Sequence, residues 1–319
     1  MNIELTKIDF NDYLNHYVDL KKEFGNNVEK AKQHWINHGK YEGRLVKINF
    51  DYNKIEKFIT NITLKSNSYF SNILINKNEK CLGIKDIFLV TTLYNETNIV
   101  RKKELMLALN HNINNKMITK IILFYDTSKG KDISTLLYLS SIDKILIQFT
   151  KERPFFKKMM EFSNNFSLNY CKNNIISQRK ALFIISNTDI IFDETLAKIY
   201  SINMSNKILA LTRWDFVAEN KIGIRVANNK IMTTSQDTWI FESPLDLRSL
   251  NPEFDQIQLG TWECDGAINY FVKKSNINIF NPCLDIKTLH IHFSNVRNYI
   301  DKEIKYNSET KAISVSQIK

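Results

Sequence analysis

Asp189 stands where a buried strand is expected to end. Residues 182–185 form an apolar run that stops at the polar residues 186–189, which is the pattern of a parallel strand leading into a loop. In open α/β sheets, ligands bind outside the carboxyl ends of the strands, so a carboxylate here can hold a divalent cation against a phosphate. An aspartate could instead cap a following helix. Because Asp189 follows the strand directly, we assign the metal to Asp189 and the helix cap to Asp193.

Two further pairs of chemically useful residues come later in the chain. Glu263 and Asp265 lie two positions apart, just before an amphipathic helix predicted over residues 267–272, and Asp265 could cap that helix. His290 and His292 alternate in a predicted strand, which places both side chains on one face. By pattern alone, these histidines are either metal ligands or buried structural residues.

Composition and charge limit the classes of function. The 319 residues carry a formal net charge of +10 that is spread along the chain, which predicts anionic ligands such as nucleotide phosphates, an acidic glycan or a membrane surface, and no nucleic acid. The four cysteines are far apart and form no CxxC pair, which argues against a zinc site or a disulfide framework and favours a reducing compartment. Neither a signal peptide nor a membrane-spanning run is evident, so we expect a cytoplasmic protein.

The order of the expected elements predicts an α/β fold behind a small helical module. Residues 1–48 contain two short helical patterns, and residues 49–86 read as a connecting segment with one helix. Strands at 87–92, 121–125, 145–149, 182–185 and 208–212 alternate with helices, which is typical of a mostly parallel sheet with crossover helices. The first strand is followed by neither GxGxxG nor GxxxxGK, which disfavours hydride transfer and NTP hydrolysis. We expect residues 301–319 to form a flexible tail.

Several motifs in one order resemble a known enzyme class. LVTTLYNE, ISNTDIIFDETL, LALTRWD, SQDTWIFESP, LGTWECDGAINY and NPCLDIKTLHIHFSNVRNY, spread over residues 87–300, are similar to glycosyltransferases of the GT-A fold, including predicted transferases of large DNA viruses. Such enzymes use an Asp-x-Asp motif at a strand end to bind Mn²⁺ or Mg²⁺ against the diphosphate of a nucleotide-sugar. Here Asn187 replaces the first acid of that motif, and Asp189 is the second.

The N-terminal module carries a resemblance of its own. It is similar to short helical units that precede glycosyltransferase and cell-surface domains in some microbial and large-virus proteins. For a viral protein, the expected compartment is the host cytoplasm. The residues that carry this likeness are Tyr13-Leu14, Asp19-Leu20, His34-Trp35, His38-Gly39 and Glu42-Gly43-Arg44. The histidines at positions 34 and 38 are spaced like metal ligands, but no third ligand is apparent, so we assign them a structural role.

The resemblance implies a role for each candidate site residue. Asp265 matches the catalytic base of inverting enzymes, with Glu263 beside it, and the late histidines His290 and His292 match metal ligands, His292 being preferred. The donor, a UDP-sugar by resemblance, would be bound by Thr91, Thr92, Asn95, Arg101, Asp126, Arg153, Asn187 and Asp189, and the sugar or acceptor would be contacted by Trp214, Asp237 and Trp262.

The sequence therefore predicts a metal-dependent glycosyltransferase that acts on a glycan or glycoprotein acceptor. The net positive charge of the chain is compatible with peripheral contact with a membrane. The alternative is a GT-A fold that has lost its activity and serves as a glycan-binding or scaffold protein. Asn187 favours the alternative, whereas Asp189, Asp265 and the late histidines favour the enzyme.

Overall fold

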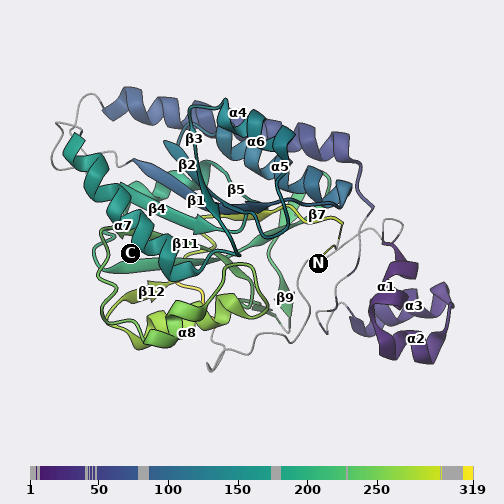
Figure 1. Ribbon diagram of the computed structural model, residues 1–319. Coiled ribbons are helices and arrows are strands. Elements are labelled where there is room, and N and C mark those ends of the chain that lie inside the picture. The colour runs from purple at the N-terminus through teal and green to yellow at the C-terminus, as the bar shows by residue number, and fades with distance from the viewer. Residues whose placement is uncertain are drawn as a thin grey trace.

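A seven-stranded, mostly parallel sheet forms the centre of the computed structural model of this protein (Figure 1). Its strand order is β12-β6-β11-β4-β1-β2-β3, and only β11 runs antiparallel to its neighbours. The strands are β1 (Ile87–Tyr94), β2 (Lys120–Asp126), β3 (Ile145–Thr150), β4 (Ala181–Ser186), β6 (Lys207–Thr212), β11 (Gln236–Ser243) and β12 (Asn278–Phe280). The structure describes residues 8–39, 49–77, 86–173, 181–227, 229–294 and 312–318, with the single residues 5, 42, 44, 46 and 296.

Both faces of the central sheet are buried, because alternate side chains of its strands enter two different cores. Phe88 and Phe183 belong to the core on one face, and Leu89 and Ile184 to the core on the other. Burying an apolar side chain of this size contributes about 1.5–3 kcal/mol, which explains why the strands read as unbroken apolar runs. The first face is covered by α7 (Phe156–Asn173) and α8 (Cys264–Lys274), and the second by α5 (Ile99–Asn114), α6 (Ile133–Ser140) and the 3₁₀ segment η3 (Glu194–Ser201).

A second, four-stranded sheet has the order β5-β13-β7-β8. It packs with the long helix α4 (Tyr52–Lys77) around a separate core that includes Ile55, Phe216 and Leu289. Its strands are β5 (Ile190–Phe192), β7 (Trp214–Ala218), β8 (Lys221–Gly223) and β13 (Thr288–His290). The remaining elements are a two-stranded ribbon and a 3₁₀ turn. The ribbon consists of β9 (Val226–Ala227) and β10 (Lys230–Ile231), and the turn is η4 (Pro252–Gln256). This sheet is decisive for the site, since β5 begins directly after Asp189 and β13 ends at His290.

The N-terminal module has its own small core, made by residues such as Tyr13, Leu20 and Trp35 (Figure 1). Three helices and a π-helical turn replace the two helical patterns of the sequence, because Tyr17 is extended and interrupts the first pattern. The His34 ring lies 3.0 Å from the Tyr13 hydroxyl, measured from Nδ1, which supports its structural role. The elements are α1 (Phe10–His16), α2 (Val18–Phe24), α3 (Val28–His34) and η2 (Trp35–Gly39).

The predicted fold class, a mostly parallel sheet flanked by helices behind a helical module, is confirmed. The five predicted strands of the central sheet are present. The strand predicted around His290 and His292 is shorter than expected, because β13 ends at His290. The strands β5, β7, β8, β11 and β12 have no counterpart in the sequence analysis. Part of the expected tail is ordered by contacts: Gln236 bonds both the Ile313 amide and its carbonyl, and Val315 bridges to Asn281. The rest of that tail up to residue 311 lies outside the described residues. Within the described part of the chain, no helix has the length and apolar character needed to cross a membrane.

Candidate active site

A cleft of about 750 Å³ opens at the edge of the main sheet where β1, β2 and β4 end and β11 begins. Two residues of the N-terminal module, His16 and Tyr17, line it from another side. Most residues expected at the site share this cleft, namely Thr92, Arg101, Asp126, Arg153, Asn187, Asp189, Asp237, Trp262, Glu263, Asp265, His290 and His292.

Three expected site residues are not among the described residues that line the cleft. Thr91 is buried and donates to the Ser186 carbonyl at 2.9 Å, because alternation along β1 turns it away from the side of Thr92. The Asn95 amide donates to the Lys129 carbonyl at 3.2 Å. The Trp214 indole donates to the Cys283 carbonyl at 2.9 Å, so it packs within the second sheet region.

Asp189, His290 and His292 form a candidate metal centre. One potential ligand atom from each lies within 4.8 Å of the others. The second sheet brings them together, because His290 pairs with Ile190 across β13 and β5, and the Ile291 amide donates to the Asp189 carbonyl at 2.8 Å. The sequence left open which histidine belongs to the centre, and the structure places both there.

The partners of these atoms test whether a cation fits. Asp189 Oδ1 and His292 Nε2 are both buried and have no hydrogen-bond partner among the described residues. Such orphaned polar atoms are costly unless something binds them. A carboxylate oxygen and imidazole nitrogens are ligands that suit a first-row divalent metal such as Mn²⁺. The donor set therefore fits a divalent cation.

Neighbouring charges set the protonation of the centre. Burial alone would raise the pKa of Asp189, but Arg101 and His290 beside it hold that pKa well below its usual range. Burial, reinforced by Arg101, holds the pKa of His292 well below its usual range, which leaves a neutral imidazole with a free lone pair. Burial and Arg213 work against protonation of His290, yet the carboxylates of Asp189 and Asp215 outweigh them and raise its pKa.

A chain of ion pairs leads from His290 to Asp237. His290 Nδ1 lies 2.9 Å from Asp215, and Asp215 also contacts Arg225 at 2.6 Å and Arg213 at 3.2 Å. Arg213 reaches Asp237 at 2.7 Å. Arg213 and Asp215 have no role in the sequence-based prediction, although they directly follow a predicted strand, as Asp189 does, and that position is a signal for a site residue.

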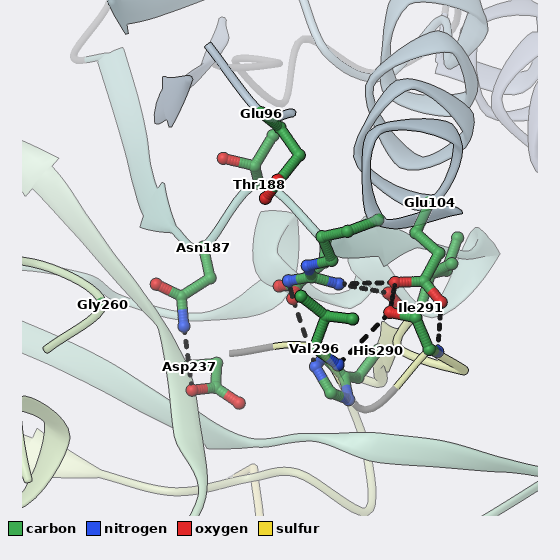
Figure 2. A network of polar contacts seen from close by, with 12 residues as sticks. Glu96, Glu104, Asn187, Thr188, Asp237, Gly260, His290, Ile291 and Val296 are labelled. Carbon is green, nitrogen blue, oxygen red and sulfur yellow. Dashed lines mark hydrogen bonds and ion pairs between the residues drawn. The ribbon is translucent and has the colours of Figure 1, made fainter. Parts of the chain in front are cut away.

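Asn187, the residue in place of the expected first acid, has a different role from a metal ligand. Its amide nitrogen donates to Asp237 Oδ1 at 3.0 Å, as Figure 2 shows. The amide at this position therefore makes a hydrogen bond that orients another cleft acid. Asp193 caps η3 through the Thr195 amide, and the predicted capping role of Asp193 is confirmed.

Asp265 lies in the first turn of α8 and has the properties of a base. Its carboxylate accepts a hydrogen bond from the backbone amide of Gln236 at 3.3 Å. Burial, with a further contribution from the carboxylate of Asp237, raises the pKa of Asp265 to about 6, which is near the pH at which a general base works best. Glu263 precedes it in a left-handed conformation (φ 59°) and makes no side-chain cap.

Arg153 and Gly260 line the cleft close to Asn187. The Arg153 guanidinium donates to the Gly260 carbonyl. Gly260 has a φ of 77°, a conformation that residues with a side chain rarely adopt, and an added Cβ there would lie 3.6 Å from Asn187 Oδ1 and 3.7 Å from the guanidinium. Among the cleft arginines, Arg153 contacts no carboxylate within the described residues, so it is available to an anionic ligand.

No protein-family model matches the sequence, and no curated protein is similar to it. Among solved structures, GalNAc-T7 with UDP, GalNAc and Mn²⁺ shares 10% identity at a TM-score of 0.39, over 69% of this chain and 45% of its own. TarS of S. aureus shares 10% identity at a TM-score of 0.34, over 67% of this chain and 60% of its own. The chain thus spans less than two thirds of either neighbour. At this level of similarity, neither assigns a donor, an acceptor or a reaction to this chain.

Proposed function

We propose that the protein is a metal-dependent glycosyltransferase that moves a sugar from a nucleotide-sugar to an acceptor hydroxyl with inversion. The observation that carries this proposal is a pair of buried ligand atoms, Asp189 Oδ1 and His292 Nε2, that have no hydrogen-bond partner in the described part of the chain and lie in the cleft that also holds Asp265. A metal centre and a carboxylate of raised pKa in one cleft are the two parts that this reaction needs. The sequence resemblance points independently to the same reaction and to a UDP-sugar donor.

The charge of the cleft supports a role for the cation. Among the described residues that line it, four are arginines and five are carboxylates, so this part of the lining offers no excess of positive charge to a diphosphate. Asp189, His290 and His292 would hold Mn²⁺ or Mg²⁺. Bound there, the ion supplies the positive charge that stabilises a leaving diphosphate.

The remaining residues divide between donor and acceptor. Thr92 and Asp126, at the ends of β1 and β2, lie where the nucleoside would bind, and Arg153 would contact the diphosphate. Asp265 would accept the proton of the acceptor hydroxyl. Trp262 is 37% exposed in the cleft, so its ring can stack on a sugar of the glycan or glycoprotein acceptor.

Thermal-shift measurements test this proposal. UDP, GDP, CMP and ADP would each be added with and without Mn²⁺ to the wild type and to Asp189→Asn. A ligand at about 100 times its dissociation constant adds about 2.7 kcal/mol of stability. We expect one nucleoside diphosphate to raise the melting temperature only with Mn²⁺, and Asp189→Asn to abolish the shift. The absence of any shift in the wild type under all conditions would refute the proposal.

A second candidate function is an inactive, glycan-binding or scaffold protein. Asn187 favours it, because this amide stands where GT-A enzymes carry an acid and is engaged by Asp237 instead. Mn²⁺-dependent hydrolysis of a nucleotide-sugar would exclude this alternative. Glycan binding without nucleotide binding would establish it.

A further inference from the structure

Glu104 is a fully buried carboxylate in α5 that holds the chain just beyond the candidate metal ligands. Its Oε1 accepts hydrogen bonds from two successive amides, Phe293 and Ser294, each at 2.6 Å, and from the Tyr52 hydroxyl at 3.2 Å. Its Oε2 accepts from the Ser294 hydroxyl at 2.9 Å. Phe293 directly follows His292, so these bonds fix the backbone just after that ligand.

Arg101 connects the same carboxylate to the other ligands. It lies one turn before Glu104 on α5, and its guanidinium contacts Glu104 Oε2 at 3.0 Å. It also donates to the Ile291 carbonyl at 3.3 Å, between the two histidines, and to Asp189 Oδ2. The resemblance implies that Arg101 binds the donor, and Arg101 lines the cleft. It is 8% exposed and paired with the carboxylates of Glu104 and Asp189, so it also supports the metal centre.

We propose that Glu104 is the positioning residue of the metal centre: it sets His292 through the Phe293 and Ser294 amides, and Asp189 through Arg101. This inference rests on the proposed metal-dependent function. It adds that one carboxylate, far in sequence from Asp189 and His292, holds the two segments that carry these ligands in position. Asp189 Oδ1 stays available to a cation because Arg101 occupies only Oδ2 of the same carboxylate.

The arrangement requires a carboxylate rather than an amide. Oε1 faces backbone donors and Oε2 faces the Arg101 guanidinium, so both oxygens meet groups that can only donate. In Glu104→Gln, either orientation of the amide places its NH₂ group against one of these donors. The variant keeps the volume of the side chain. It must displace either the backbone that follows His292 or the guanidinium of Arg101.

Mn²⁺ binding to the whole protein tests the proposal without any activity assay. The electron paramagnetic resonance signal of free Mn²⁺ gives the dissociation constant for the wild type, Glu104→Gln and the matched control Glu242→Gln. Glu242 is also buried, but it pairs with Leu182 at the opposite end of β4 from Asp189. Circular dichroism and a cooperative melt establish that each variant is folded.

We expect Glu104→Gln to raise the Mn²⁺ dissociation constant at least tenfold and Glu242→Gln to leave it within twofold of the wild type. A folded Glu104→Gln that binds Mn²⁺ like the wild type would overturn the inference, as would an equal loss in the control. If Glu104→Gln does not fold, Arg101→Lys decides: weaker Mn²⁺ binding supports the inference, and unchanged binding overturns it. A wild type that binds no Mn²⁺ refutes the metal-dependent function itself, and the inference with it.

Discussion

Replacing Asp265 by asparagine should slow transfer and, at neutral pH, stabilise the folded protein. Burial and Asp237 raise the pKa of Asp265 from 3.8 to about 6, so the folded state disfavours the ionised form. Ionisation of Asp265 therefore lowers the free energy of unfolding. This loss of stability is absent below about pH 4, grows as pH rises through the folded pKa, and reaches its full size above that pKa. Two pKa units correspond to about 3 kcal/mol, which is the upper limit of the stabilisation expected in Asp265→Asn at pH 7.

The same shift predicts the pH dependence of transfer. With a pKa of about 6, roughly a tenth of Asp265 is ionised at pH 5, so a reaction that needs the base should be about tenfold slower there than at pH 8. An aspartate with an ordinary pKa would show no such loss. Asp265→Asn should lower the rate by about 10²–10⁴-fold, the usual contribution of a general base.

The assay pairs initial rates of transfer with melting temperatures, from pH 4 to pH 8. Asp255→Asn is a suitable control, since Asp255 pairs with Lys157 at 2.6 Å in a partly exposed contact away from the cleft and should affect neither readout strongly. A wild-type-like rate in Asp265→Asn would refute its role as base. A melting temperature lowered equally at pH 4 and pH 7 would refute the electrostatic argument, because only loss of packing or hydrogen bonds is independent of pH.

Four other substitutions test the assignment of the cleft. Arg153→Met should weaken binding of a nucleoside diphosphate about tenfold or more, measured by calorimetry, while binding of the nucleoside alone stays unchanged. Trp262→Ala should raise the KM for the acceptor without loss of stability, whereas Trp214→Phe should leave that KM unchanged and cost about 1 kcal/mol in denaturant unfolding, since it loses the bond to Cys283. Gly260→Ala should destabilise the protein by about 1 kcal/mol or more and weaken donor binding, because the positive φ of 77° strains any residue with a side chain. A wild-type unfolding curve for Gly260→Ala would contradict that account.

Much of the central fold was predictable because its signals are local. The apolar runs at β1, β2, β4 and β6 reflect burial of both faces of a parallel sheet, which leaves a direct mark on the sequence. The edge strand β3 is only partly buried, but its apolar run is still recognisable. The second sheet leaves fewer marks. The strand around His290 is predicted from the alternation of its histidines, whereas β5 and β8 have three residues each and carry too little periodicity to be recognised. Which strands pair is decided only when the chain folds.

The sequence by itself determined the chemistry on offer: a carboxylate after a strand, an acid before a helix, and two histidines in alternation. Only the tertiary structure decided how they meet. Asp189 and His290 are 101 positions apart and become neighbours because β5 and β13 pair. Likewise, Arg101 and Glu104 look like an ordinary helical ion pair in the sequence, and their place behind the ligands follows from the packing of α5 against the second sheet. Residue types and spacing are local properties, whereas burial, pairing and shared hydrogen bonds arise only when distant segments come into contact.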